Sequence, residues 1–320
     1  MLIIKSNTTN PYFNIAAEEY LLHEKSDNLF MVYINKPSIV VGKHQNTLAE
    51  INYQYIKEKN IHVIRRLSGG GTVDHDSGNI NFTFIEDVKG KNLIDFKKYT
   101  APIISFLRKM GVNARFEGKN DLRIDGLKIS GNAEHVFKNR VLHHGTLLFD
   151  SQLDALNEAI RVQLDKYRDK AVKSIRSSVT NIKSHLKNPL SIEQFTNAIL
   201  IEIMNANRSS FAYQFSTADK EKINKLMEEK YKTWDWNFGY SPKYELINDF
   251  NSNPPFQITI SVEKGIIKTL QIKDQHGHTC MKNLSNALIG EKHNEETIAK
   301  HLHKKGIKET IPPGFIYAFL

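Results

Sequence analysis

The sequence of 320 residues has one cysteine, Cys280, and no long hydrophobic run. A single cysteine excludes an intramolecular disulfide and any cysteine-rich zinc site. No segment approaches the roughly 18 consecutive apolar residues of a membrane helix. The beginning, MLIIKSNTTNPYF, lacks the basic segment and long apolar core of a signal peptide. We therefore expect a reducing, cytoplasmic location and no membrane partner.

Several common catalytic and binding signatures are also missing. The chain has no Gly-x-Ser-x-Gly nucleophile elbow and no internal repeat. No helix-turn-helix or aromatic-rich RNA-binding motif is visible, so we expect no nucleic-acid partner. The net charge of +9 favours some acidic partner but does not identify it.

The composition is typical of a globular protein with a sizeable core, with 40% apolar and 25% charged residues. The length indicates one large domain, or a large and a small one. Gly, Pro, Ser and Asn accumulate over residues 232–256, as they do in linkers. We therefore predict a large domain at 1–245 and a small one at 246–320.

Hydrophobic periodicity predicts a mixture of helices and strands, and hence an α+β protein. Asn10 and Pro11 indicate a helix start, and Ser191 with Gln194 forms a capping-box pattern. Helices are expected at 10–25, 50–60, 96–112, 151–164, 191–207, 217–230, 283–290 and 294–304. Strands are expected at 28–36, 38–43, 61–66, 79–85 and 141–150, with hairpins at 121–130 and 257–273.

The stretch RRLSGGGTVDHDSGNINF, residues 65–82, has three consecutive glycines between two predicted strands. A P-loop or a Rossmann turn needs a helix directly after its glycines, so both are excluded. Glycine still permits positive φ and lets backbone N–H groups converge on an anion. Because Arg65 and Arg66 alternate in facing, at most one is expected to point into a pocket. We choose Arg66, at the loop entrance, and expect Arg65 to be a surface charge.

Asp125-Gly126 predicts a two-residue hairpin turn between 121–124 and 127–130. Ile124 should then pair with Leu127, Arg123 with Lys128, and Asp121 with Ser130. One face would carry these polar residues, and the other would be core. A carboxylate diagonal to a lysine can hold Mg²⁺ and neutralise phosphate oxygens. A weak surface ion pair is the alternative.

The adjacent histidines His143 and His144 should point to opposite faces of a strand, which disfavours a metal site made by this pair. A polar pocket wall or a hydrogen-bonded core histidine fits better. His75, between Asp74 and Asp76, is expected in a capped turn rather than in a chelate.

Five segments together resemble the lipoate–protein ligase family. They are RRLSGGGTVDHDSGNINFTF (65–84), KNDLRIDGLKISGNA (119–133), HHGTLLFD (143–150), KSIRSSVTNI (173–182) and WDWNFGYSP (234–242). The resemblance covers residues 1 to about 245 closely, and the remainder matches the family's small C-terminal domain in position and size. It implies a biotin/lipoate ligase-like catalytic fold with a small α+β accessory domain.

The resemblance also implies a two-step reaction. Lipoate and Mg-ATP give lipoyl-AMP and pyrophosphate, and the acyl group then moves to a lysine of an acceptor protein. Glycine-cleavage H protein and the lipoyl domains of 2-oxoacid dehydrogenase E2 subunits are the implied acceptors. ATP and Mg²⁺ are co-substrates, and no tightly bound prosthetic group is expected.

The resemblance assigns roles to individual residues. Lys128 would contact the lipoate carbonyl and the phosphate, Asp121 would be the Mg²⁺-associated aspartate, and His144 would lie near the dithiolane. The acyl pocket would include Ser68, Gly69 and Gly70. The remaining substrate- and ATP-binding positions are Arg66, Gly71, Thr72, Val73, Asp74, His75, Asn79, Asn120, Ser130, Gly131, Gly145 and Thr146.

Three residues depart from the family pattern: Thr72, Asp74 and Lys119, of which Asp74 replaces a usual aromatic near adenine. The alternative function is an ATP-independent octanoyl or lipoyl transferase of the same fold. Relatives of that kind generally use a cysteine nucleophile, which 1–245 lacks. A biotin ligase is disfavoured because its Gly-Arg-Gly loop is absent, and a basic binding module lacks a supporting motif.

Overall fold

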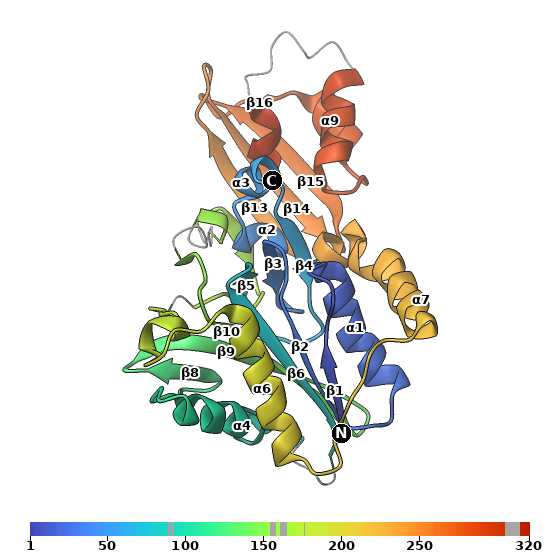
Figure 1. Ribbon diagram of the computed structural model, residues 1–320. Coiled ribbons are helices and arrows are strands. Elements are labelled where there is room, and N and C mark those ends of the chain that lie inside the picture. Colours follow the sequence, from blue (N-terminus) through green and yellow to red (C-terminus); the bar gives the residue numbers. More distant parts are fainter. Residues whose placement is uncertain (89, 91–92, 154–157, 161–164, 176, 305–313) are drawn as a thin grey trace. The chain divides into compact units, whose positions relative to one another are not determined.

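The computed structural model describes the chain except residues 89, 91–92, 154–157, 161–164, 176 and 305–313 (Figure 1). Contacts group it into two compact units. The first comprises Met1–Lys43, His62–Asn157 and Ile175–Lys232, and the second comprises His44–Ile61, Glu158–Ser174 and Thr233–Leu320. The expected helix at 151–164 falls largely outside the described residues. The division at 245/246 stays a prediction.

An eight-stranded mixed sheet forms the centre of the first unit, in the order β12-β1-β2-β6-β10-β9-β8-β7. Strand β1 pairs in parallel with β12 and β2, and the other pairs are antiparallel. The strands are β1 (Leu2–Lys5), β2 (Leu29–Tyr33), β6 (Asn79–Asp87), β7 (Arg115–Glu117), β8 (Asp121–Ile124), β9 (Leu127–Phe137), β10 (Arg140–Leu148) and β12 (Phe211–Ala212).

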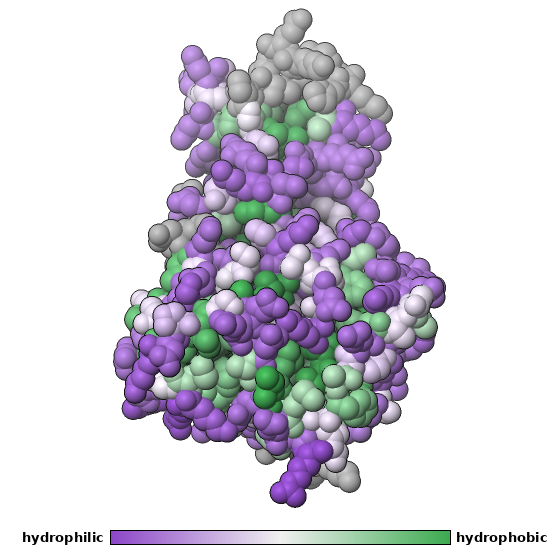
Figure 2. All heavy atoms as spheres, viewed as in Figure 1, coloured by the Kyte–Doolittle hydropathy of each residue, from purple (hydrophilic) through white to green (hydrophobic). Residues whose placement is uncertain are grey.

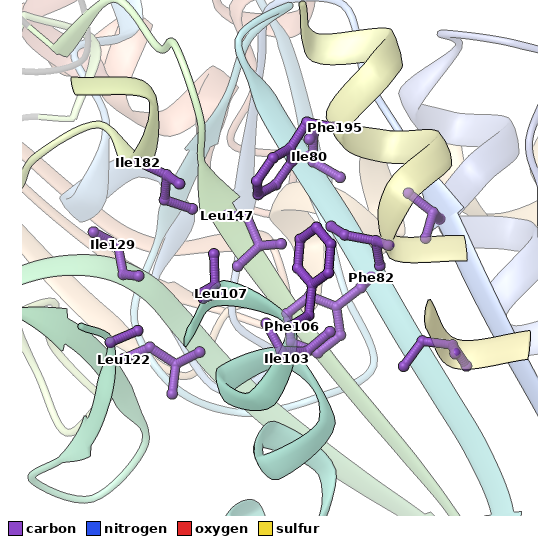
Figure 3. Close-up of a cluster of buried hydrophobic side chains, with 14 of the residues drawn as sticks. Ile80, Phe82, Ile103, Phe106, Leu107, Leu122, Ile129, Leu147, Ile182 and Phe195 are labelled. Atoms are coloured by element: carbon purple, nitrogen blue, oxygen red, sulfur yellow. The ribbon is translucent and has the colours of Figure 1, made fainter. Parts of the chain in front are cut away.

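Helices α4 (Phe96–Lys109) and α6 (Ile192–Ala206) pack on one face of this sheet and form the main core with it. Figure 3 shows Phe82 of β6 beside Phe106 of α4, with Phe195 of α6 close to Ile80. Burial of each such side chain stabilises the fold by about 1.5–3 kcal/mol. The predicted capping box of Ser191 and Gln194 starts α6.

Helix α1 (Pro11–Glu24) lies on the opposite face. Its Glu18 accepts hydrogen bonds from Tyr33 of β2 and Thr83 of β6. The strand neighbours of these residues, Val32 and Phe82, belong to the main core, so the period-two alternation of strands directs Tyr33 and Thr83 to the α1 face. The Asn10 side chain caps α1 as predicted, with Pro11 at its first position. The unit also contains α7 (Thr217–Leu226), the π-helix Met227–Tyr231 and the 3₁₀ helix Ile182–His185.

A three-stranded sheet, β4-β3-β5, carries the glycine loop. It consists of β3 (Ser38–Val41), β4 (His62–Arg65) and β5 (Val73–His75), with β4 parallel and β5 antiparallel to β3. The loop at 66–72 therefore connects strand to strand, as the sequence predicts. Both of its ends are fixed by β3, so the loop is an ordered connection and not a linker.

The second unit contains a five-stranded sheet in the order β11-β13-β14-β15-β16. The predicted hairpin is β14 and β15. Strand β13 lies within the segment that its composition marked as linker, and this interpretation is wrong for those residues because alternate side chains of β13 are buried. The strands are β11 (Tyr167–Asp169), β13 (Tyr244–Phe250), β14 (Phe256–Glu263), β15 (Ile266–Asp274) and β16 (Thr279–Cys280).

Short helices complete this unit. They are α2 (Thr47–Glu50), α3 (Tyr53–Glu58), α8 (Lys282–Leu288), α9 (Glu295–Lys304), the π-helix Asp235–Gly239 and the 3₁₀ helix Phe315–Phe319. The helix expected at 50–60 is thus split into α2 and α3. Leu284 and Leu288 of α8 and Ile298 of α9 join the buried face of the sheet in a second core.

On the face of the molecule in Figure 2, hydrophilic side chains are spread over both units and interspersed with smaller apolar areas. Among the described residues, no helix combines the length and the apolar character needed to span a bilayer.

Candidate active site

Arg66 holds the glycine loop through hydrogen bonds to its backbone carbonyls. Its guanidinium Nη2 donates to the carbonyl oxygens of Gly69 (2.6 Å) and Gly71 (2.8 Å), and Nη1 donates to the Val40 carbonyl (3.0 Å). Burial lowers the pKa of Arg66 to about 10, which leaves it cationic at neutral pH. Gly70 has φ +89°, and a Cβ there would lie 3.2 Å from Arg66 Nη2. The arginine and the glycines therefore specify one loop conformation.

Arg65 is not the surface charge that the alternation of facing predicted. It is fully buried, and its Nη1 donates to the carbonyls of Gly42 and Lys43, both at 3.0 Å. Arg66 is also buried, and it binds the carbonyls of the loop rather than standing at the loop entrance. Two successive arginines can both be inside because backbone carbonyls receive each guanidinium, a pairing that strand alternation does not reveal.

Ser68 and His144 bring the loop and strand β10 together. Ser68 Oγ lies 2.5 Å from His144 Nε2, and it also accepts a hydrogen bond from Arg66 Nε at 3.0 Å. His144 Nδ1 lies 2.8 Å from Glu18 Oε2. His144 is thus a hydrogen-bonded, nearly buried histidine, which is one of the two forms that the sequence favours.

Asp74 and His75 are neighbours on β5, and their pKa values are shifted in opposite directions. Burial, with a smaller contribution from Asp76, raises the pKa of Asp74 to about 8. Burial, together with the charge of Arg66, lowers the pKa of His75 to about 3, and its Nδ1 lies 2.9 Å from Asn35 Nδ2. Both shifts favour the uncharged form of the side chain at neutral pH. His75 lies on a strand rather than in the expected capped turn.

The hairpin β8–β9 has the predicted turn, with Asp125 at φ 49° and Gly126 at φ 80°. Ile124 pairs with Leu127 and Arg123 with Lys128, as predicted. A bulge between Leu122 and Arg123 then shifts the register, so Asp121 faces Gly131 and not Ser130. Two side chains also lie on other faces than predicted. Ser130, expected on the polar face, is fully buried, and Leu127, expected in the core, is 37% exposed.

One carboxylate holds two cations on this hairpin. Asp121 Oδ1 lies 2.9 Å from Lys128 Nζ, and Oδ2 lies 2.8 Å from Arg123 Nη2. Lys128 extends over Gly131, where an added Cβ would approach its Cε and Nζ to 3.2 Å. The sequence therefore predicted the carboxylate–lysine pair correctly, and Gly131 gives the lysine its room.

Two of the family-like segments lie side by side at Lys128. The Lys128 N–H donates to the Ser178 carbonyl at 2.9 Å, and the Thr180 N–H donates to the Lys128 carbonyl at 3.0 Å. The segment KSIRSSVTNI thus reaches the hairpin residue that the resemblance makes central.

The other predicted positions lie on the adjoining strands. Gly131 N–H donates to Thr146 Oγ1 at 3.2 Å, and Asn120 and Asn132 exchange hydrogen bonds between their side chains and backbones. Gly145 faces Asn132, and a Cβ there would lie 2.2 Å from its Oδ1. Asn79 is fully buried; its Nδ2 donates to Asn81, and its Oδ1 has no hydrogen-bond partner among the described residues.

Three buried residues of this region escaped the sequence analysis: Glu18, Asn132 and Glu134. Glu134 Oε1 lies 2.8 Å from His143 Nδ1, and Asn132 Oδ1 lies 3.3 Å from His143 Nε2. The sequence feature that could have indicated these partners is the His143-His144 pair. Two histidines on opposite faces of a buried strand each need a polar partner, and acidic residues in otherwise apolar segments are the candidates. No cluster of three or more potential metal ligands occurs in the described part of the chain.

Comparison with solved structures identifies the fold. LipL1 of Plasmodium falciparum in complex with lipoate has a TM-score of 0.64 at 25% identity, over 95% of this chain and 94% of that one. A putative lipoate protein ligase of Thermoplasma acidophilum with bound lipoic acid has a TM-score of 0.63 at 22% identity, over 74% and 98%. The α+β fold class is confirmed, including the resemblance to the lipoate ligase catalytic fold.

The chain belongs to the lipoyl protein ligase A/B catalytic domain family, whose model matches residues 10–204. Lipoate–protein ligase 1 of Staphylococcus aureus is 42% identical over 304 residues, which cover 94% of this chain and 92% of that protein. Lipoate-protein ligase LplJ of Bacillus subtilis is 39% identical over 315 residues, which cover 96% and 95%. The predicted resemblance is therefore confirmed across nearly the whole chain.

Proposed function

We propose that this protein is an ATP-dependent lipoate–protein ligase. It activates lipoate as lipoyl-AMP, releases pyrophosphate and transfers the lipoyl group to a lysine of an acceptor protein. The observation that carries the proposal is the ion pair of Asp121 and Lys128 beside the 178–180 segment, in a chain 42% identical to a lipoate–protein ligase over 94% of its length.

In the first step a lipoate carboxylate oxygen attacks the α-phosphorus of ATP, and the bond to the β-phosphate breaks. Negative charge accumulates on the phosphate oxygens in the transition state. In this proposal Lys128 Nζ moves from Asp121 to the carboxylate and α-phosphate oxygens, where its charge is most stabilising. Lys128 gives up one contact with Asp121 in this movement. Its ammonium group has three N–H donors, so it can bind the carboxylate and the α-phosphate oxygens together.

The glycine loop would contribute backbone donors. The two ends of a trans peptide point in opposite directions, so a Gly69 carbonyl directed at Arg66 leaves the Gly70 N–H directed away from it. Such an outward N–H next to a buried guanidinium suits an anionic ligand. We propose that the acyl-adenylate lies along residues 68–74. Asn79, Asn120 and Thr146 would contact it from the adjoining strands.

Magnesium fits this site as a companion of the nucleotide. Hard oxygen ligands suit Mg²⁺, and Asp121 supplies carboxylate oxygens. One carboxylate does not make a resident site, so the phosphates have to provide further oxygens. The ion would neutralise phosphate charge, and the Asp121 oxygen that Lys128 leaves would be available to it.

In the second step the amine of the acceptor lysine attacks the acyl carbon, AMP leaves, and the amine loses a proton. An archaeal lipoate protein ligase of bipartite form has been solved as a system with its E2 lipoyl domain. We propose lipoyl domains and H protein as acceptors here. The net charge of +9 would steer acidic acceptors to the enzyme, and an association rate that does not change with salt would contradict this.

We further propose that 1–245 is the catalytic domain and 246–320 an accessory domain that moves between the two steps. Adenylation needs water excluded, whereas transfer needs access for a bulky protein. Identical positions of 246–320 in crystal structures with and without lipoyl-AMP would refute this movement.

The test is a reconstituted reaction of the purified full-length chain with lipoate, Mg-ATP and apo H protein or an apo lipoyl domain. We expect release of pyrophosphate and an acceptor heavier by one lipoyl group. A parallel reaction replaces lipoate and ATP with octanoyl-acyl carrier protein. Acceptor modification in that reaction alone would make the chain an ATP-independent transferase.

A further inference from the structure

We infer that Glu18 is a positioning residue of the ligase reaction, which fixes the glycine loop through His144, Ser68 and Arg66. This role rests on the proposed function. Glu18 lies on α1, far along the chain from the loop, and belongs to none of the predicted site positions. The contacts form a continuous path of four buried or nearly buried side chains.

The proton positions along this path follow from donor and acceptor chemistry. Glu18 Oε1 faces the hydroxyls of Tyr33 (3.0 Å) and Thr83 (2.5 Å), and Oε2 faces His144 Nδ1 at 2.8 Å. An ionised carboxylate only accepts, and with this set it accepts from all three groups. His144 Nδ1 therefore carries a proton, and the inferred path has the neutral imidazole, whose Nε2 is an acceptor.

The remaining links then have a single direction. With His144 Nε2 unprotonated, Ser68 Oγ donates to it and accepts from Arg66 Nε. The chain of donors then runs from the buried guanidinium of Arg66 to the buried carboxylate of Glu18 through Ser68 and His144. Each charge offsets part of the desolvation cost of the other, and the aligned hydrogen bonds reinforce one another.

The far end of the path is the loop itself. Arg66 Nη2 holds the carbonyls of Gly69 and Gly71, so the orientation of its guanidinium sets the orientation of these peptides. If Glu18 cannot accept from His144, the imidazole is free to take the other tautomer, with its proton on Nε2. Ser68 then loses its acceptor, and Arg66 loses its fixed neighbour.

The adjacent residue provides a matched control. Glu19 is also a buried carboxylate of α1, and it also accepts from a buried tyrosine, Tyr231 at 2.5 Å, as well as from Lys230 at 2.7 Å. None of the contacts described for it reaches His144. Glu18→Met and Glu19→Met therefore remove the same group from the same helix. Only Glu18→Met removes the hydrogen bond to His144.

The experiment records the ¹⁵N signals of His144 and the kinetics of lipoate-dependent pyrophosphate release for the wild type and both variants. We expect the Nδ1–H tautomer in the wild type and in Glu19→Met, and a mixture with Nε2–H in Glu18→Met. We expect kcat/KM for lipoate to fall about tenfold or more in Glu18→Met, and less than about threefold in Glu19→Met. Both should lose thermal stability to a similar degree.

Equal kinetic losses in the two variants, or an unchanged tautomer in Glu18→Met, would overturn the inference. If Glu18→Met does not fold, the wild-type signal decides, since a His144 proton on Nε2 contradicts the path outright. A wild type that releases no pyrophosphate but shows the Nδ1–H tautomer refutes the proposed function and leaves the path as architecture only, so the two failures are distinguishable.

Discussion

Asp121 Oδ1 lies 2.9 Å from Lys128 Nζ, across a hairpin whose turn is two residues long. The carboxylate holds the lysine over Gly131. A lysine fixed in this way loses little conformational entropy when a phosphate replaces its partner. In the proposed function this arrangement would favour adenylation, and the first prediction concerns the lysine.

Lys128→Ala should abolish formation of lipoyl-AMP and leave the fold intact. The side chain is partly exposed and contributes no core packing, so its loss removes charge stabilisation alone. The check is pyrophosphate release together with the circular dichroism spectrum. Lys97→Ala, at an exposed lysine of α4, is the control and should keep wild-type activity. Near-normal turnover of Lys128→Ala would refute the assigned role.

Asp74→Asn should flatten the pH dependence of stability. The folded pKa of Asp74 is raised from 3.8 to about 8, so the folded protein binds the proton more tightly than the unfolded chain does. Asp74 therefore costs stability as pH rises from about 4 to about 8. The slope is at most about 1.4 kcal/mol per pH unit.

Urea unfolding at pH 5 and pH 7 measures this effect. Between the two, the wild type should lose about 1–3 kcal/mol relative to Asp74→Asn. Asp27→Asn, at an exposed carboxylate of the same unit, should follow the wild type. Parallel curves for the wild type and Asp74→Asn would show that Asp74 is ionised in the folded protein.

Arg66→Lys should weaken ATP binding although it preserves the charge. The guanidinium binds Val40, Ser68, Gly69 and Gly71 together, and an ammonium group cannot reach this set. KM for ATP should rise about tenfold, because the loop loses its fixed conformation. Titration with ATP in the pyrophosphate assay checks it, and an unchanged KM would separate Arg66 from nucleotide binding.

Gly145→Ala should be among the most damaging single-methyl additions. Its Cβ would lie 2.2 Å from Asn132 Oδ1 and 2.6 Å from Phe82 Cζ, so the β9–β10 pair has to shift. We expect a loss of about 3 kcal/mol or more of unfolding free energy. Gly118→Ala provides the contrast, since φ is +66° but the space is open, and about 1 kcal/mol is expected.

The local elements were predictable from the sequence because short-range chemistry determines them. Asp125-Gly126 specified the hairpin turn, Asn10 and Ser191 specified helix starts, and the strands around the glycines identified the loop as a strand-to-strand connection. The position of Asp121 diagonal to Lys128 followed from the turn and the period of two.

What the sequence could not reveal depends on contacts between distant segments. The bulge beside Leu122 shifted Asp121 by one residue, because a strand accommodates an extra residue without a local sequence signal. Arg65 is buried because carbonyls of Gly42 and Lys43 receive it. Glu18 is separated from His144 by more than a hundred residues, so periodicity gave no reason to connect them.

The central claim is that this chain makes lipoyl-AMP. Its most direct test is a single-turnover reaction of the wild-type protein with lipoate and Mg-ATP, without any acceptor, followed by mass spectrometry of the bound ligands. We predict lipoyl-AMP retained on the enzyme in near-stoichiometric amount, and one pyrophosphate released per site. Unchanged ATP and lipoate, under conditions in which both bind, would contradict the account.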